Sequence, residues 1–334
     1  MNKIKIGLIG AGRIGTFHGT TVAKRLENTE LVAISDPFKL NAEKLASELK
    51  VNKVYENPND LLADDEVEAV IIATPAKTHS SLVIAAAKAN KSVFCEKPMA
   101  TNLKDANNVI NVVQNAGVKL QIGFNRRFVD EFKQAENEIR QKCIGKPQTL
   151  RSLTRDPVLN NAEKIPKWTI FLETLIHDFD TLNFLNPDAI PVSVYASADA
   201  LIRPDLKEHG LLDTAIVTIK YSNGAIAIAE ASFQAVYGYD VRAEVLGLEG
   251  MLKMGSSSVN SMIRYTKGGV NFDTSRKDTD LLFNAYVNEM HQFSNDVKYD
   301  NISSPTGEDA KKALAIALAC IESVKKNSEA IVEL

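Results

Sequence analysis

The feature of the sequence that most constrains the fold is a glycine-rich turn near the start of the chain. The apolar run Ile4–Ile9 leads into a GxGxxG motif that ends at Gly15, and a segment of helical period follows. The glycines let the backbone approach a pyrophosphate closely, and the N-terminus of the helix supplies amide donors and the positive end of its dipole. Strand, motif and helix in this order predict a dinucleotide-binding turn. Its expected cofactor-binding residues are Gly10, Ala11, Gly12, Arg13 and Ile14.

An acidic residue follows at the distance that this motif requires. The second predicted strand, 31–35, runs into Asp36, which lies 21 residues after Gly15. A carboxylate at that place accepts hydrogen bonds from both ribose hydroxyls in the adenosine half of NAD and repels the 2′-phosphate of NADP. The sequence therefore predicts NAD as the cofactor.

Short apolar runs alternate with segments of helical period as far as residue 124. The runs are continuous rather than alternating, which is typical of strands buried on both faces of a parallel sheet. This pattern predicts an α/β fold of the doubly wound Rossmann type. The expected strands are 4–9, 31–35, 53–55, 69–73, 92–95 and 119–122, and the expected helices are 12–27, 41–49, 78–90 and 103–116.

The pattern changes after Asn125, where strand-like segments follow one another and Ser222-Asn223-Gly224 marks a hairpin turn. We therefore expect a Rossmann domain in residues 1–124 and an α+β domain with a mostly antiparallel sheet in residues 125–334. The expected strands are 148–155, 192–200, 214–221, 225–232, 241–247 and 251–254, and the expected helices are 128–141, 171–185 and 306–326. Thr306 can cap the last helix, which is a candidate to pack back on the first domain.

Charge and composition exclude several classes of protein. The chain of 334 residues carries 39 Lys and Arg against 42 Asp and Glu, so it lacks the basic excess of a nucleic-acid binder. No stretch approaches the ~18 apolar residues of a membrane span, and glycines interrupt the apolar start where a signal peptide needs an unbroken core. The three cysteines lie far apart and match no metal-ligand spacing. These features predict a cytoplasmic protein whose partner is a small molecule rather than a nucleic acid or a membrane.

Further site residues are expected at the carboxyl ends of the parallel strands, which line the ligand crevice of a doubly wound sheet. Those beside the cofactor are Ala73, Thr74, Pro75 and His79 after the fourth strand, and Glu96 and Lys97 after the fifth. The ammonium group of Lys97 could stabilise the alkoxide that develops as a secondary alcohol loses its proton. The alternative for Lys97 is a solvated charge in a turn.

A helix in the second half carries a candidate acid–base group. At 100° per residue, Glu173, His177 and Asp180 fall within ~60° of each other along the border of its apolar face. A carboxylate four residues away can fix the tautomer of His177 and stabilise its protonated form, as a general base on an alcohol requires. One alternative is an exposed helical ion pair. Another is a metal site, but the spacing is no zinc signature, and we predict no metal.

With these motifs the chain resembles the GFO/IDH/MocA family of oxidoreductases over essentially its whole length. The GxGxxG motif and Glu96-Lys97-Pro98 are typical of the family, and three later motifs resemble the branch that acts on inositol. The segments that carry the resemblance are 10–15, Asp36, 74–79, 94–98, 123–128, 155–157, 176–180 and 235–240.

The resemblance implies roles for individual residues and a mode of assembly. Lys97 and His177 match the catalytic lysine and histidine of the family, while Glu173 stands where an aspartate is usual. The residues implied beside the substrate are Lys97, Arg127, Asp156, His177, Tyr237 and, less directly, Tyr286. The resemblance also implies a cis peptide before Pro98 and an open sheet used for oligomerisation, commonly in a homotetramer. The chain departs from the family at Trp168-Thr169, where Gly-Gly is usual and the tryptophan adds bulk beside the expected pocket.

The leading functional expectation is NAD-dependent oxidation of a secondary hydroxyl of a cyclic polyol, namely myo-inositol to scyllo-inosose. One alternative is a dehydrogenase or reductase for another inositol isomer or sugar. Another is a catalytically silent regulator that binds NAD and a sugar. The retained Lys97 and His177 favour an enzyme, while Glu173 and Trp168 keep the regulator open.

Overall fold

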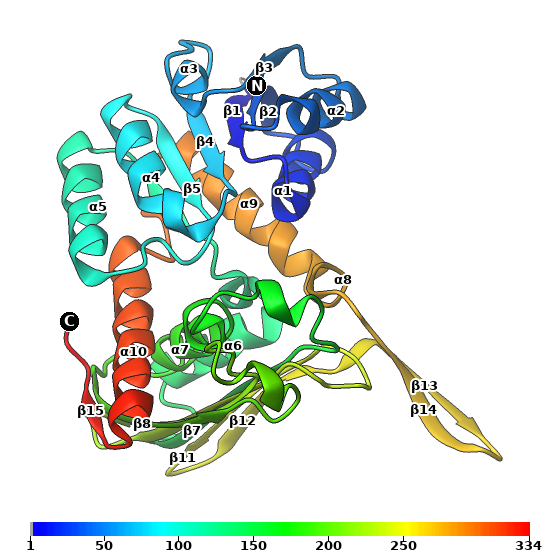
Figure 1. Cartoon of the computed structure of the whole chain (residues 1–334), viewed down its shortest axis with the longest axis vertical. Coiled ribbons are helices and arrows are strands. Elements are labelled where there is room, and N and C mark those ends of the chain that lie inside the picture. The colour runs from blue at the N-terminus through cyan, green and yellow to red at the C-terminus, as the bar shows by residue number, and fades with distance from the viewer. Residues whose placement is uncertain (1–2) are drawn as a thin grey trace. The chain divides into compact units, whose positions relative to one another are not determined.

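The computed structural model describes residues 3–334, and its first sheet has six parallel strands in the order β3-β2-β1-β4-β5-β6 (Figure 1). The strands are β1 (Ile4–Ile9), β2 (Thr29–Ser35), β3 (Lys53–Tyr55), β4 (Ala69–Ile72), β5 (Ser92–Cys95) and β6 (Leu120–Ile122). The helices between them are α1 (Arg13–Lys24), α2 (Lys39–Leu49), α3 (Pro58–Leu62), the 3₁₀ turn η1 (Ala76–Thr78), α4 (His79–Lys88) and α5 (Leu103–Ala116). The predicted Rossmann fold is confirmed. Two short elements were not expected, the turn η1 and the helix α3, which is capped by the side chain of Asn57.

The strand order places a ligand crevice beside β1. This strand pairs with β2 on one side and with β4 on the other, so the order of the strands reverses between β1 and β4. Helices that leave neighbouring strands on opposite faces open a crevice at the carboxyl ends of those strands, where such folds bind their ligands. The turns after β1, β2, β4 and β5 are therefore the part of this sheet to search for a site.

The chain divides into two compact units that do not follow its order. The first contains the described residues up to Asn125 together with Asn284–Lys311, and the second contains Arg126–Phe283 and Lys312–Leu334. Helix α9 (Phe283–Tyr299) brings Met290 and Phe293 into the core of the first unit. No helix within residues 3–334 has both the length and the apolar composition that crossing a membrane requires.

The second unit is built on a seven-stranded sheet in the order β12-β11-β7-β10-β9-β8-β15. All its neighbouring strands are antiparallel except β7 and β10, as the prediction of a mostly antiparallel sheet requires. The strands are β7 (Pro147–Arg155), β8 (Pro191–Asp199), β9 (Thr214–Tyr221), β10 (Ile226–Ser232), β11 (Asp240–Gly247), β12 (Met251–Ser256) and β15 (Ala330–Ile331).

Several helices and turns accompany this sheet. They are η2 (Asn125–Phe128), α6 (Asp130–Arg140), η3 (Ala162–Lys164), α7 (Leu175–Phe184), η5 (Pro204–Leu206), α8 (Asp278–Leu281) and α10 (Gly307–Lys326). Thr306 caps α10 as expected, because its hydroxyl accepts from the Asp309 amide at 3.1 Å while the Asp309 carboxylate accepts from the Thr306 amide at 2.8 Å. The first residues of α10, up to Lys311, belong to the first unit and the rest to the second.

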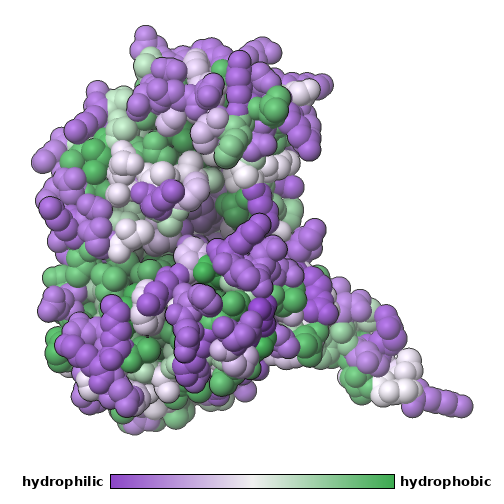
Figure 2. All heavy atoms as spheres, in the orientation of Figure 1, coloured by the Kyte–Doolittle hydropathy of each residue, from purple (hydrophilic) through white to green (hydrophobic). Residues whose placement is uncertain are grey.

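Two elements of the second unit differ from the prediction. The expected helix 171–185 begins as a π-helical turn, η4 (Ile170–Thr174), and only then continues as α7. A hairpin of β13 (Ser258–Thr266) and β14 (Gly269–Thr274), which was not predicted, extends beyond the sheet (Figure 1). Its residues are almost all exposed, and apolar and polar side chains mingle on its surface (Figure 2). We call this hairpin the arm.

A buried carboxylate joins α7 to the sheet. Asp178 accepts from Arg126 at 2.7 Å, from the Ser152 hydroxyl at 2.5 Å and from the Thr154 hydroxyl at 2.6 Å. Asp178 is fully buried and Arg126 is only 4% exposed. Both strand residues lie at alternate positions of β7, so they define the face of the sheet that α7 covers. Arg126 and Asp178 therefore form a buried ion pair.

The buried contacts of Asp178 with Arg126, Ser152 and Thr154 predict a large effect of Asp178→Ala on stability. Removing one partner of a buried charge pair leaves the other charge uncompensated, so we expect the unfolding free energy of the second unit to fall by about 3–5 kcal/mol. Urea denaturation followed by circular dichroism measures the change. The exposed residue Asp188 provides a matched control, and Asp188→Ala should change the unfolding free energy by less than about 0.5 kcal/mol. Equal stability of the two variants would contradict a stabilising role of the buried contacts of Asp178.

Candidate active site

The glycine-rich turn after β1 holds α1 against the end of the strand. Gly10 has a φ of +101°, in the region that favours glycine, and a Cβ on Gly15 would lie 1.9 Å from the carbonyl oxygen of Gly10. A side chain at either position would force the helix away from the strand. The two glycines therefore allow α1 to begin directly over the turn, with its first amides directed at the space beyond β1.

The start of α1 fits a bound pyrophosphate. Within the part of the chain described, the first turn of α1 has no acidic residue, and the capping residue Gly12 makes no side-chain hydrogen bond. A Cβ on Gly12 would meet nothing within 4 Å, so the backbone there faces open space. Backbone amides at a helix N-terminus attract anions. The turn after β1 and the first residues of α1 contain Gly10, Ala11, Gly12, Arg13 and Ile14, whose contact with the cofactor remains a prediction.

Asp36 lies beside this turn at the end of β2. One carboxylate oxygen accepts from the Ala11 amide and the other from the Phe38 amide, both at 2.8 Å. The carboxylate is therefore fixed next to the motif without a side-chain cation paired to it in these contacts. This position and charge suit the recognition of ribose hydroxyls in NAD.

The segment after β4 lines the same crevice. The backbone of Ala73 approaches Gly10 so closely that a Cβ on Gly10 would lie 2.5 Å from the Ala73 carbonyl oxygen. Thr74 and Thr78 share a hydrogen bond of 2.8 Å between their hydroxyls. The buried ring of His79 lies between two carbonyl oxygens, that of Pro98 at 2.8 Å and that of Thr74 at 2.7 Å. His79 therefore ties the turn after β4, which includes Pro75, to the turn after β5.

Glu96 and Lys97 occupy the turn after β5, and the peptide between Lys97 and Pro98 is cis, as the resemblance implies. The carboxylate of Glu96 is turned toward His18 on α1 at 2.8 Å, and its second oxygen accepts from the Lys97 amide at 3.2 Å. Glu96 thus holds the backbone of Lys97. Its predicted contact with the cofactor remains a prediction.

In the second unit, Arg127 is oriented by Asp180. Its Nε and a terminal nitrogen donate to the two oxygens of Asp180 at 2.9 and 2.6 Å, and its guanidinium lies 4.9 Å from the ring centre of Phe184. A two-point ion pair of this kind fixes the plane of the guanidinium. Asp180, which we considered beside Glu173 and His177 as a possible metal ligand, is therefore engaged by an arginine.

The helix that carries His177 has an unusual start. Glu173 lies exposed on the π-helical turn η4, whereas His177, four positions later, lies half-buried on α7, so the helix type changes between them. π-Helical turns are rare and are frequent at functional sites. Trp168, two residues before η4, has a φ of +68°, which a bulky residue seldom adopts. The tryptophan thus occupies a backbone conformation that suits the glycine usual in the family.

Asp156 follows β7 and lies beside Tyr239. The Asp156 amide donates to the Ser232 carbonyl at 2.9 Å, which continues the pairing of β7 with β10. Burial raises the pKa of Tyr239 well above its ordinary value, and the neighbouring Asp156 carboxylate raises it further. Tyr239 therefore stays a neutral phenol that hydrogen-bonds to Asp156. The sequence analysis did not single out Tyr239, although it lies within the motif 235–240.

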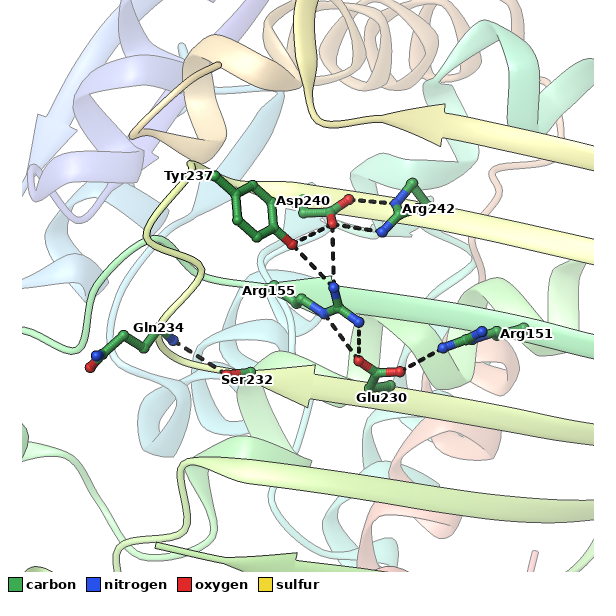
Figure 3. Close-up of polar contacts among 8 residues, drawn as sticks. All are labelled: Arg151, Arg155, Glu230, Ser232, Gln234, Tyr237, Asp240 and Arg242. Carbon is green, nitrogen blue, oxygen red and sulfur yellow. Dashed lines mark hydrogen bonds and ion pairs between the residues drawn. The ribbon is translucent and has the colours of Figure 1, made fainter. Parts of the chain in front are cut away.

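Tyr237 belongs to a network of charged side chains on the sheet (Figure 3). Its hydroxyl donates to Asp240 at 2.8 Å and accepts from Arg155 at 3.1 Å, and Arg155 also pairs with Glu230. Arg155 alternates along β7 with Ser152 and Thr154, so it points to the face opposite α7. The predicted substrate contact of Tyr237 is untested, and the structure places its hydroxyl in this network.

Tyr286 is buried in the first unit, on α9. Its ring centre lies 5.3 Å from that of Phe17 and 6.0 Å from that of His18, both on α1.

The predicted site residues divide between the two units. The structure brings together the cofactor residues predicted in the first unit, and Arg127 and Asp156 lie in the second unit with Glu173, His177 and Tyr237. Neither His18 nor Glu289, which lies near Glu96, was predicted as a site residue. The signal for His18 was its place three residues after Gly15.

Two family models match the chain. Residues 4–124 match the GFO/IDH/MocA oxidoreductase family model for the NAD-binding Rossmann fold, and residues 137–334 match the model for the C-terminal alpha/beta domain of the same family. The dinucleotide-binding turn described above lies within the first match. The prediction of NAD as the cofactor is therefore confirmed at the level of the family.

Individual relatives agree over almost the full length. Myo-inositol 2-dehydrogenase of Thermotoga maritima is 35% identical over 97% of each chain, and scyllo-inositol 2-dehydrogenase (NAD(+)) of Bacillus subtilis is 32% identical over 97% of this chain and 95% of the relative. The crystal structure of scyllo-inositol dehydrogenase from Lactobacillus casei with bound NAD(H) and scyllo-inositol is similar with a TM-score of 0.95, at 28% identity and 99% coverage of both chains. The motifs, both domains and these relatives agree, and the chain belongs to the GFO/IDH/MocA family of NAD-dependent oxidoreductases.

Proposed function

We propose that the chain oxidises a secondary hydroxyl of inositol with NAD, with myo-inositol to scyllo-inosose as the leading reaction. The observation that carries this proposal is the likeness to inositol dehydrogenases, which extends through both units. The geometry supports it from the side of the cofactor, because an open helix N-terminus and the carboxylate of Asp36 flank one turn.

Each site residue would have its own role in this reaction. Bound NAD would accept the hydride, and the turn after β1 together with Asp36 would hold it. His177 would take the hydroxyl proton, and Lys97 would stabilise the negative charge that develops on the substrate oxygen. Glu173 would hold and charge-balance the imidazole of His177. Arg127 and Asp156 would bind substrate hydroxyls, since each is already fixed by a neighbour, Asp180 and Tyr239 respectively.

A second candidate substrate is scyllo-inositol. The Bacillus subtilis and Lactobacillus casei relatives are named for this isomer, and they match the chain over nearly the same length as the myo-inositol enzyme. The two isomers differ in the orientation of one hydroxyl, so the choice depends on the substrate contacts of the second unit. The retained Lys97 and His177 argue against a silent regulator. We also propose a cytoplasmic location, supported by the three cysteines, all of which are free thiols.

Cofactor choice is the first test. Asp36→Ser removes the charge that opposes a 2′-phosphate, so we expect the ratio of kcat/KM for NAD to that for NADP to fall by about tenfold or more. The increase in absorbance at ~340 nm as NADH or NADPH forms gives the initial rates, and from them the ratio of the two kcat/KM values. The exposed residue Asp60 of the same unit supplies the control, and Asp60→Ser should leave the ratio unchanged. Equal kcat/KM for both cofactors in the parent protein would refute the role of Asp36.

The second test separates chemistry from binding. Lys97→Ala and His177→Ala should each lower kcat by ~100-fold or more, a usual contribution of a general base or a charge-stabilising group, while the Kd for NAD changes little. Assays with inositol isomers give kcat, and fluorescence titration gives the Kd. Matched controls are Lys104→Ala and His209→Ala, at exposed positions. A variant at Lys97 or His177 with the turnover of its control would lose its assigned role.

We further propose that copies of the chain assemble, as in the homotetramer that the family resemblance implies. The sheet face opposite α7 exposes a group of large apolar side chains: Tyr195 (45%), Ile216 (52%), Ile226 (47%), Ile228 (41%) and Leu246 (40%). The arm is a two-stranded hairpin with its own exposed apolar residues, and such hairpins are only marginally stable alone. A second copy laid on this face would cover apolar surface and surround the charged network of Figure 3.

This assembly predicts the effect of a charge at the centre of the face. Ile228→Lys should convert the oligomer to a smaller species, because an unpaired ammonium would be buried between copies. Size-exclusion chromatography with light scattering gives the mass. Ile302, which is 90% exposed in the first unit, provides the control, and Ile302→Lys should keep the parent's mass. A monomeric parent protein at micromolar concentration would contradict the proposal.

A further inference from the structure

Three buried polar side chains meet in the core of the first unit, from three separate elements. His18 comes from α1, Glu96 from the end of β5 and Glu289 from α9, and one ligand atom of each lies within 4.8 Å of the others. His18 and Glu289 are fully buried and Glu96 is 9% exposed. We call these three residues the core cluster. Two carboxyl groups this close in an apolar interior cannot both carry an uncompensated charge.

The two carboxyl groups of the core cluster have unequal surroundings. Burial raises the pKa of Glu96, but the hydrogen bond and charge of His18 and the nearby Lys97 and His79 outweigh it, so that the pKa of Glu96 lies below its ordinary value. Burial and the charge of Glu96 raise the pKa of Glu289 well above 4.5. Burial raises the pKa of both groups, but only Glu96 has neighbours that lower it, which assigns the charge to Glu96 and the proton to Glu289.

The contacts of Glu289 agree with this assignment. Neither of its carboxyl oxygens has a hydrogen-bond partner among the described residues, although both are buried. Its backbone carbonyl is engaged, since it accepts from the Gln121 side chain of β6 at 2.9 Å. An ionised carboxylate without donors would be strongly disfavoured there, whereas a neutral acid has a much smaller desolvation cost.

The groups that face Glu289 come from the packed elements around it. They are His18 from α1 and Glu96 at the end of β5, and the rings of Phe17, Phe94 and Tyr286 lie next to His18. Cys95 is a buried thiol whose pKa is raised by burial and by Glu96, so it adds no charge. Among the charged neighbours, Lys97 helps to lower the pKa of Glu96.

A divalent cation is the other way to neutralise two carboxylates, but the geometry favours a proton. His18 Nε2 and Glu96 Oε1 already form a hydrogen bond of 2.8 Å, which an ion would have to replace. Among the His, Cys, Asp and Glu side chains of the described residues, the group found here has three members, and a metal ion with so few ligands needs others, such as water or substrate, to complete its coordination. A single proton on Glu289 needs neither.

We propose that Glu289 is kept as a neutral carboxylic acid and acts as a positioning residue for the segment Glu96-Lys97. Its neutrality lets Glu96 remain charged, and Glu96 then accepts from the Lys97 amide at 3.2 Å and from His18. The consequence for catalysis rests on the proposed role of Lys97. If Glu289 lost its proton, two like charges would face each other and the carboxylate that holds the backbone of Lys97 would be displaced.

The sign of the pH dependence follows from the raised pKa. The unfolded chain loses the proton of Glu289 near the ordinary value, whereas the folded chain keeps it to a higher pH, so the unfolding free energy falls with pH between these two values. Glutamine has nearly the shape of the neutral acid and no proton to lose. The difference in Tm between Glu289→Gln and the parent should therefore grow with pH, on the order of 3 °C per pH unit within that window.

Thermal unfolding of the full chain from pH 5 to pH 9 tests the proposal without any substrate, so its outcome does not depend on the proposed function. Glu27→Gln, at an exposed position of the same unit, is the matched control and should show no such growth. The infrared band of a protonated carboxyl group should be present in the parent at neutral pH. It should be weaker in Glu289→Gln and unchanged in Glu27→Gln. A constant difference in Tm across this range, or an unchanged band, overturns the proposal.

Two further measurements complete the experiment. One equivalent of metal in the purified parent that Glu289→Gln lacks would overturn the proposal in favour of a cation site. If Glu289→Gln does not fold, Glu289→Leu and the parent's own infrared band decide, because an apolar residue replaces a neutral acid but not an ionised one. Where turnover is measured, the decline of kcat at high pH in the parent should shift upward in Glu289→Gln, and Gln should restore more turnover than Ala.

Discussion

The first unit depends on a steric constraint at its first turn: α1 can begin over the end of β1 only because Gly15 has no side chain to meet the carbonyl oxygen of Gly10. This approach fixes the helix in direction and in depth. Its first amides then face the space where a pyrophosphate fits, and one turn later His18 lies deep enough to reach Glu96 at 2.8 Å. One contact between glycines thus places both the cofactor end of the helix and the buried group behind Lys97.

The second unit uses charge where the first uses close backbone contact. Asp178 and Asp180 are buried acids two residues apart on α7, and they pair with neighbouring arginines of η2, Arg126 and Arg127 respectively. The pair Asp178–Arg126 joins the helix to β7, and the pair Asp180–Arg127 fixes a guanidinium for the substrate proposed here. Of these two ion pairs between α7 and η2, one therefore serves the packing of the unit and the other its proposed chemistry.

The sequence predicted the elements whose pattern follows directly from burial. Continuous apolar runs identified all six parallel strands, and β9 was predicted with its observed bounds. The arm was missed because its strands are exposed on both sides and show no alternation. The π-helical turn was missed because its apolar spacing differs too little from that of an α-helix to be read from five residues. Within the candidate site, Asp36 was predictable from a fixed spacing, whereas Glu289 enters through a contact between segments almost two hundred residues apart, which no local pattern reports.

The return of α9 to the first unit has a consequence for how the molecule can be divided. Its side chains Met290 and Phe293 complete the core beneath the parallel sheet, although the match to the Rossmann family model ends at residue 124. The boundary by which families are recognised is therefore not a boundary of cooperative packing. A gene fragment cut at that point would encode the motif but lack part of its hydrophobic core, and an exchange of domains between relatives must carry two separate stretches of chain together. The two regions that match family models therefore differ in their boundaries from the two units that pack as compact bodies.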